Sequence, residues 1–160
     1  MRWEGPDEGS PTAASPARQH SLERPSETKD VRRVLLRLHE VLELPGHLYD
    51  YHFAIQSTYM SIFEQRREDL AMLQEVERLC WLDIELLEAH PEMVQSELGK
   101  YFHVRAYDIL IRLYETEGDF AGALEVAEQG KRLGQEEYLA KQADRLRARL
   151  AELEAEDMPW

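Results

Sequence analysis

Histidine offers the widest chemistry among the residues of this sequence, because its ring can bind a metal ion or exchange a proton near neutral pH. A zinc site built on one helix takes two histidines four residues apart, as in the His-Glu-x-x-His motif. Here His39-Glu40 begins that motif, but Glu43 stands where the second histidine belongs, and no two histidines are four residues apart. The sequence therefore predicts no metal and no cofactor. It favours a hydrogen-bonded core position for His52, which lies on an aromatic stripe.

A catalytic thiol is the next candidate, since the chain has a single cysteine, Cys80, which cannot form an internal disulfide. Cys80 lies on the apolar side of a predicted helix and beside Trp81. Burial in such surroundings raises the pKa of a thiol and makes it a poor nucleophile. The sequence has no glycine-rich phosphate loop, nucleophile elbow or dinucleotide-binding fingerprint. We therefore expect that the protein is not an enzyme, and an all-helical enzyme is the least favoured of three functions.

Acidic residues dominate the charge of the chain, with 32 Asp and Glu against 19 Lys and Arg and a formal net charge of -13. The negative electrostatic field of such a chain repels phosphate backbones and anionic lipid surfaces. The composition thus predicts neither nucleic acid nor membrane as a partner. The acidic residues between positions 68 and 88 either form a surface for cations and basic peptides or keep a helix face solvated.

The elements that position these residues are predicted to be helices. Apolar residues recur at steps of three and four from residue 29 onward, and no segment alternates with period two. The predicted helices span about 29–44, 47–66, 68–89, 93 or 96–117, 120–133 and 135–155. Pro45-Gly46, His90-Pro91 and Gly118-Asp119 supply breaks, with Gly118 as a helix stop and Asp119 as the next N-cap. The predicted fold class is all-α.

The first 28 residues differ in composition from the rest. They are rich in Pro, Ser, Gly, Ala and Glu, and beyond the initial methionine they have only Trp3 and Leu22 as large apolar residues. Such a segment buries too little to offset the entropy of ordering it. We expect a disordered tail at 1–28 and one helical domain at 29–157. The start of the chain also lacks the apolar run of a secretory signal or spanning helix, which favours a cytoplasmic protein.

Small residues crowd the stretch from Gly118 to Gly130, where two helices could approach closely. The residues with a recognisable spacing are Tyr107, Leu110, Tyr114, Ala123 and Ala127. Over about residues 104–134 the pattern resembles a tetratricopeptide repeat. Ile111 departs from the family, which prefers a small residue there, as does Ala127, where an aromatic is preferred, and Gln135 replaces the closing proline. The resemblance implies antiparallel helical hairpins stacked as a short bundle with a C-terminal capping helix.

The resemblance also implies a binding site, because the first helix of each hairpin lines a concave groove in this family. The polar residues implied for that groove are Arg105, Asp108, Arg112 and Glu115. Arginine can hold a partner carboxylate by two parallel hydrogen bonds, although Asp108 and Arg112 could instead pair with each other. The implied function is an adaptor or scaffold that binds another protein or peptide.

The alternative function is a regulatory or sensor domain related to helical-repeat transcription regulators. Only the first predicted helix, with Arg32, Arg33 and Arg37, is basic enough to contact DNA, and acidic residues lie near it.

The last predicted helix has a narrow apolar stripe at alternating steps of four and three, made of Leu139, Ala143, Leu146, Leu150 and Leu153. This spacing is typical of a coiled-coil seam, so the four leucines are candidates for a homo-oligomer interface, with capping of the bundle as the other role. In the preceding helix, Gly122 and Gly130 each cost about 1 kcal/mol relative to alanine. We expect close contact at these glycines, or a frayed helix end at Gly130.

Overall fold

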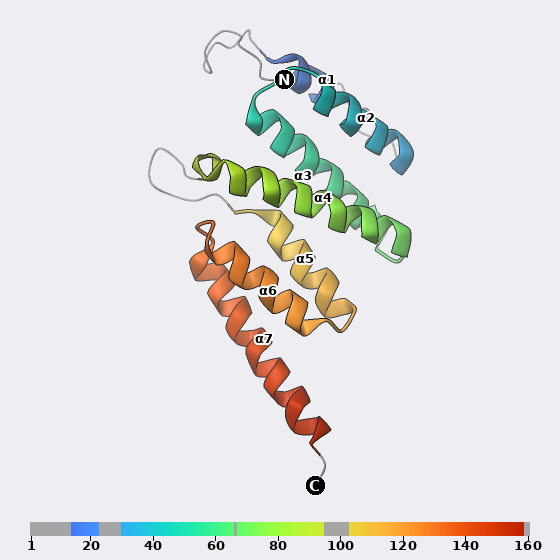
Figure 1. The fold of residues 1–160 in the computed structure, drawn as a ribbon. Coiled ribbons are helices and arrows are strands. Elements are labelled where there is room, and N and C mark those ends of the chain that lie inside the picture. The colour runs from blue at the N-terminus through green and yellow to red at the C-terminus, as the bar shows by residue number, and fades with distance from the viewer. Residues whose placement is uncertain (1–13, 23–29, 66, 95–102, 159–160) are drawn as a thin grey trace. The chain divides into compact units, whose positions relative to one another are not determined.

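The computed structural model describes residues 14–22, 30–65, 67–94 and 103–158 (Figure 1). These residues form α-helices and one short 3-10 helix and contain no strand, so the predicted all-α class is confirmed. In chain order the elements are α1 (Pro16–Leu22), α2 (Val31–Glu43), α3 (Leu48–Gln65), α4 (Leu70–Ala89), η1 (Pro91–Met93), α5 (Arg105–Thr116), α6 (Phe120–Lys131) and α7 (Glu136–Asp157). No helix in the described part of the chain combines the length and apolar character needed to span a bilayer.

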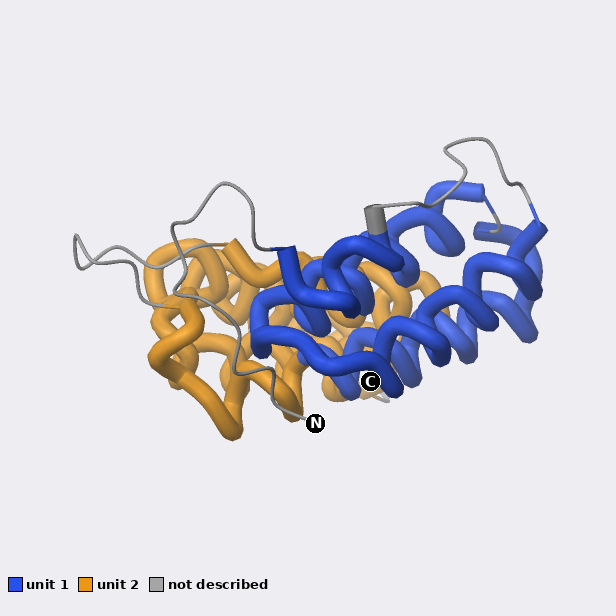
Figure 2. Tube along the Cα trace, turned by 90° about the horizontal axis from the view of Figure 1, so that it is seen from above, with its two compact units in different colours: residues 1–83 blue, residues 84–160 orange. Residues whose placement is uncertain are grey.

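The chain divides into two compact units, residues 1–83 and 84–160, and the division falls within α4 (Figure 2). The core of unit 1 is formed by the apolar faces of α2, α3 and the first part of α4. Its buried apolar residues include Val34, Leu38, Val41, Ile55, Ile62, Val76 and Leu79. The stripes that the sequence predicted for these three helices are thus largely the buried faces.

The tail prediction is wrong for residues 14–22. Residues 16–22 form α1, and Ser15 and Ala17 are buried in unit 1. Composition alone could not reveal this helix, because its order comes from contacts with residues far away in the sequence. Residues 1–13 and 23–29, which the prediction also covers, lie outside the described part of the chain.

Side-chain hydrogen bonds satisfy backbone groups at both ends of α2. The Asp30 carboxylate accepts the backbone N–H of Arg32 (3.1 Å) and so caps the start of α2. At the end of α2, before Pro45-Gly46, the carbonyl of Leu44 accepts the hydroxyl of Tyr51 (2.6 Å). A C-terminal carbonyl that lacks an intrahelical partner is thereby satisfied by a side chain of the next helix.

In unit 2, α5 and α6 form a hairpin at the predicted break. Gly118 has a φ of 81°, and the Asp119 side chain accepts the N–H of Gly122 (2.8 Å). Both roles were predicted from the sequence. The absence of a Cβ at Gly122 also leaves room for that carboxylate, because an added Cβ would collide with it.

The start of α5 differs from the prediction of a helix from residue 93 or 96. Val104 is extended, with φ −92° and ψ 105°, and its N–H donates to the buried Gln135 Oε1 (3.2 Å). This long-range hydrogen bond replaces a helical one, so α5 begins only at Arg105. Residues 95–102 lie outside the described part of the chain.

Close packing explains Gly130. A Cβ at this position would lie 3.0 Å from Cδ1 and Cγ of Tyr107 and would overlap Leu139 Cδ1. Tyr107 and Leu139 are both fully buried. The glycine is therefore the point where α5, α6 and α7 meet, and the frayed-end alternative is wrong.

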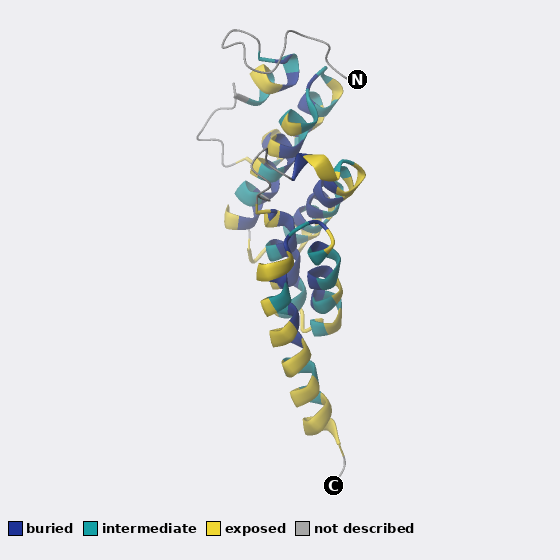
Figure 3. Cartoon of the chain, turned by 90° about the vertical axis from the view of Figure 1, so that its left-hand side faces the viewer, coloured by how far each residue is buried: buried dark blue, intermediate teal, exposed yellow. Residues whose placement is uncertain are grey.

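Helix α7 has 22 residues, whereas α5 and α6 have 12 each. At 1.5 Å per residue it is about 15 Å longer than either. Its first half packs on the hairpin and buries Leu139, Ala143 and Leu146, while its last turns are exposed (Figure 3). The predicted oligomer seam is therefore wrong for Leu139 and Leu146, which lie in the core of unit 2. Leu150 and Leu153 are half-buried.

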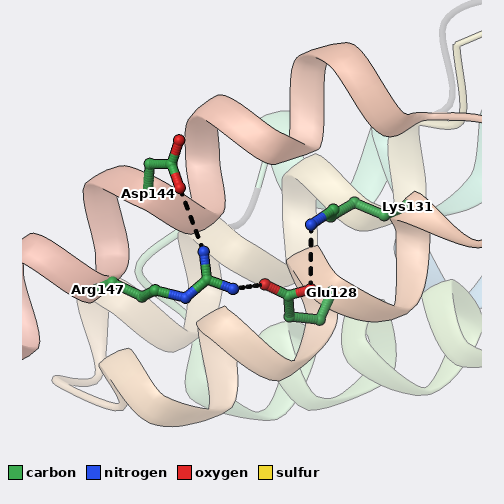
Figure 4. A network of polar contacts seen from close by, with 4 residues as sticks. All are labelled: Glu128, Lys131, Asp144 and Arg147. Atoms are coloured by element: carbon green, nitrogen blue, oxygen red, sulfur yellow. Dashed lines mark hydrogen bonds and ion pairs between the residues drawn. The ribbon is translucent and has the colours of Figure 1, made fainter.

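A network of ion pairs also connects α6 to α7 (Figure 4). Glu128 contacts Arg147 and Lys131 Nζ (3.3 Å), and Arg147 also contacts Asp144 (3.2 Å). These side chains are a quarter or more exposed, so each pair contributes at most about 1 kcal/mol. The apolar contacts beneath them are the main attachment of α7.

Candidate partner-binding site

Helices α5 and α7 of unit 2 run in the same direction and are bridged by side chains. Asp108 on α5 lies close enough to Tyr138 on α7 for its negative charge to raise the pKa of the tyrosine hydroxyl. Two turns further along α5, Glu115 accepts two hydrogen bonds from the Arg145 guanidinium on α7. The hydrogen bond donated by Arg145 Nη2 is 3.0 Å long. Each pair is separated by thirty positions in the sequence. A constant separation means that the two helices are parallel and in register.

We define the α5–α7 surface as the polar face of α5 together with the two α7 residues that lie against it: Arg105, Asp108, Arg112, Glu115, Tyr138 and Arg145. The four residues predicted from the sequence occupy successive turns of α5, since they follow one another at steps of three or four. By this spacing all four lie on one face of α5. Arg105 and Arg112 are exposed, while Asp108 and Glu115 are half-buried.

The two carboxylates of this surface are engaged by neighbouring side chains. Asp108 Oδ2 contacts His103 Nε2, and the His103 ring meets the Tyr138 ring edge-on with 5.2 Å between centroids. Glu115 is held by Arg145 in the two-pronged geometry typical of arginine and carboxylate. Each carboxylate thus contacts a side chain of the same unit, although Oδ1 of Asp108 is buried without a hydrogen bond, and both arginines of α5 are exposed.

The ionisation of two groups reflects this pairing. Burial, followed by the negative charge of Asp108, raises the pKa of Tyr138, although Arg112 and Arg145 oppose the rise. The hydrogen bond to Glu115 raises the pKa of Arg145. The Tyr138 hydroxyl therefore stays protonated and Arg145 stays charged at neutral pH.

Sequence reasoning missed His103, Tyr138 and Arg145. The last helix was considered only as an apolar seam or a cap, so its polar face was not compared with that of α5. A usable signal was present, because Tyr138, Gln142 and Arg145 recur at steps of four and three on one helix face.

The predicted repeat-packing residues are mostly buried. Tyr107, Leu110, Ala123 and Ala127 are buried and Tyr114 is half-buried. Ile111, which stands where the family prefers a small residue, is buried as well. Tyr107 meets α6 at Gly130, which is the close approach that the small residues predicted.

Unit 1 contains a second polar cluster, and it is fully buried. His52 Nδ1 lies 2.6 Å from Asp83 Oδ1, and the Tyr59 hydroxyl donates to Asp83 Oδ2 (2.9 Å). The prediction of a hydrogen-bonded core position for His52 is confirmed. Among the described residues no group of histidine, cysteine and carboxylate side chains could hold a metal ion. With no exposure to solvent, the cluster is a structural network rather than a reaction site.

Cys80 lies in the core of the same unit. Burial, with smaller contributions from Asp83 and Glu77, raises the pKa of its thiol well above the ordinary value. The expectation of an unreactive, buried thiol at pH 7 agrees with this.

The raised thiol pKa predicts a pH dependence of stability. The unfolded thiol ionises at about pH 8.5 while the folded one stays protonated, so above that pH the unfolded state binds fewer protons. Below about pH 8.5 the protonated thiol of Cys80 makes its full contribution to the free energy of unfolding. Above that pH this contribution falls by up to about 1.4 kcal/mol per pH unit, until the raised pKa of the folded thiol is reached. Urea unfolding from pH 7.5 to 9.5 should show a shallower decline for Cys80→Ala than for the wild type. Equal declines would contradict the prediction.

Comparisons of the chain with protein-family models, with curated proteins and with solved structures found no match.

Proposed function

We propose that unit 2 is a tetratricopeptide-like module that binds a partner protein through the α5–α7 surface. The observation that carries this proposal is the constant thirty-residue separation of the two contacts between α5 and α7. In a tetratricopeptide array the first helices of successive hairpins run parallel and line one groove, and the second helix packs behind them. The order α5, α6, α7 supports that arrangement, with α7 in the place of the next first helix.

The chemistry of the surface favours a partner segment with carboxylate groups. Asp108 contacts His103, Glu115 is held by Arg145, and Arg105 and Arg112 are exposed residues of α5. An arginine offers a planar fork that matches a carboxylate, and Arg105 and Arg112 lie on the same face of α5. The proposal is therefore an adaptor or scaffold that acts in binding, with no reaction at this surface.

The test is capture of co-purifying proteins by the tagged full-length chain, quantified by mass spectrometry. Arg105→Ala combined with Arg112→Ala should reduce capture of the specific partner at least tenfold, because two charge-assisted contacts of about 1.5–3 kcal/mol each are removed. Both side chains are exposed, so the helical circular dichroism signal should not change.

The matched control is Arg32→Ala combined with Arg33→Ala, since these two exposed arginines of α2 give the same change in net charge on the other unit. It should capture the partner as well as the wild type does. Undiminished capture by the double variant of α5, or equal losses in both variants, would rule out the α5–α7 surface as the binding site.

A further inference from the structure

Unit 1 holds α1 through contacts that depend on the identity of its residues. Ala17 is fully buried against Gly46, and a Cβ on that glycine would lie 2.6 Å from the Cβ of Ala17. The Ala17 N–H also donates to the carbonyl of Pro45 (3.1 Å). The loop between α2 and α3 therefore accepts a backbone and a methyl group at this point, and it has no space for a larger side chain.

One carboxylate oxygen recognises the residue that starts α1. Asp50 Oδ2 accepts the hydroxyl of Ser15 (2.6 Å) and the backbone N–H of His47 (2.8 Å), which lies just before α3. Ser15 Oγ in turn accepts the N–H of Arg18 (3.1 Å) and caps α1, with Pro16 at the first helical position. The Ser-Pro pair is thus both the start of the helix and the group that Asp50 binds.

A second polar contact lies one turn further along α1. His20 Nε2 is 2.6 Å from Glu40 Oε2 on α2. Both side chains are partly exposed, so the contact lies at the rim of the interface. Together the contacts select a serine, an alanine two residues later and a histidine three residues after that.

These contacts form a recognition site and not only helix packing. A helix of seven residues has too few hydrogen bonds to be stable by itself in water, so the order of α1 depends on the surface that holds it. The seven-residue α1 contacts two longer helices, α3 through Asp50 and α2 through Glu40. We propose that the junction of α2 and α3 is a docking site for a Ser-Pro-Ala-x-x-His segment, and that α1 is its tethered occupant.

Because α1 is attached to the same chain, its effective concentration at the docking site is high, and it prevents a separate peptide from binding there. The same segment supplied as a separate peptide should therefore bind only when the attached copy is disabled. Ser15→Ala combined with Ala17→Leu disables the attached copy, because the first change removes the hydroxyl that Asp50 binds and the second fills the space at Gly46. Both changes leave the docking surface itself intact.

The experiment is a fluorescence anisotropy titration of the full-length chain with a labelled peptide of residues 14–22, Ala-Ser-Pro-Ala-Arg-Gln-His-Ser-Leu. The disabled variant should bind the peptide saturably and at least tenfold more tightly than the wild type. A peptide with the same two changes, and the disabled variant with Gly46→Ala added, should each bind at least tenfold more weakly. Failure of the disabled variant to bind, or equal binding of both peptides, would overturn the proposal.

Limited digestion with trypsin gives an independent result if the disabled variant folds poorly. Arg18 lies within α1, and a protease cleaves such a bond through the locally opened state. In the otherwise wild-type chain, Gly46→Ala should accelerate cleavage after Arg18 at least tenfold. The same rate of cleavage in both chains would count against a site that selects alanine at Gly46.

Discussion

Replacing Asp83 with alanine is expected to lower the free energy of unfolding by about 3–5 kcal/mol. The carboxylate accepts hydrogen bonds from His52 and Tyr59, and all three side chains are fully buried. Removing it takes the acceptor from two buried donors, and each such loss costs about 1–3 kcal/mol because water cannot replace the missing partner. The measurement is urea unfolding followed by circular dichroism.

Two comparison variants distinguish the effect of losing the buried hydrogen-bond network from the effect of losing a negative charge alone. Asp144→Ala removes a carboxylate from the exposed side of α7 and should change stability by less than about 0.5 kcal/mol. Tyr59→Phe removes one of the two donors, and its effect should not add to that of Asp83→Ala. If Asp83→Ala proves no more costly than Asp144→Ala, the buried network does not stabilise unit 1 in the way described.

Changing Gly130 to alanine should destabilise the protein by about 1–3 kcal/mol, although alanine is the better helix former by about 1 kcal/mol. The new methyl group would overlap Leu139 Cδ1 and press on the Tyr107 ring at 3.0 Å. Leu139 could rotate, but the ring of Tyr107 is rigid and fully buried. The steric cost of the methyl group therefore exceeds the gain in helix propensity.

Two further variants test this explanation by urea unfolding. Leu139→Val removes the methyl group that the new Cβ meets, so the double variant should be more stable than the sum of the single effects predicts, by about 1 kcal/mol. Ala151→Gly, on the exposed part of α7, should lower the free energy of unfolding by about 1 kcal/mol. This result would show that alanine stabilises a helix relative to glycine where no close packing opposes it. A Gly130→Ala variant more stable than the wild type would contradict close packing at this residue.

Much of the fold could be predicted from the sequence because it rests on local signals. The periods of α2, α3, α4 and α6, and the turn at Gly118-Asp119, are set by residues within a few positions of one another. The start of α1 has such a signal too, a serine followed by proline, but its stability comes from Asp50 and Gly46, about thirty positions away. A helix that depends on such distant partners does not follow from composition.

The candidate site was predicted only in part for a related reason. The α5 residues follow from the family pattern, whereas their partners on α7 depend on how two helices align in space. The Asp83 network shows the same limit, since Asp83 was grouped with acidic residues of a solvated face. Its position three residues after Cys80 and four before Leu87, on the apolar side of α4, could have identified it as a core residue.

Pairing of Asp108 with His103 and of Glu115 with Arg145 has a consequence for how fast an acidic partner could associate. At long range such a partner would meet the repulsion of a strongly anionic molecule, and only within about a Debye length, roughly 8 Å at physiological ionic strength, would the two exposed arginines attract it. Added salt would then weaken both effects at once, by lowering the barrier to encounter and loosening the final contact. The rate of complex formation and its lifetime would therefore respond to ionic strength in opposite directions.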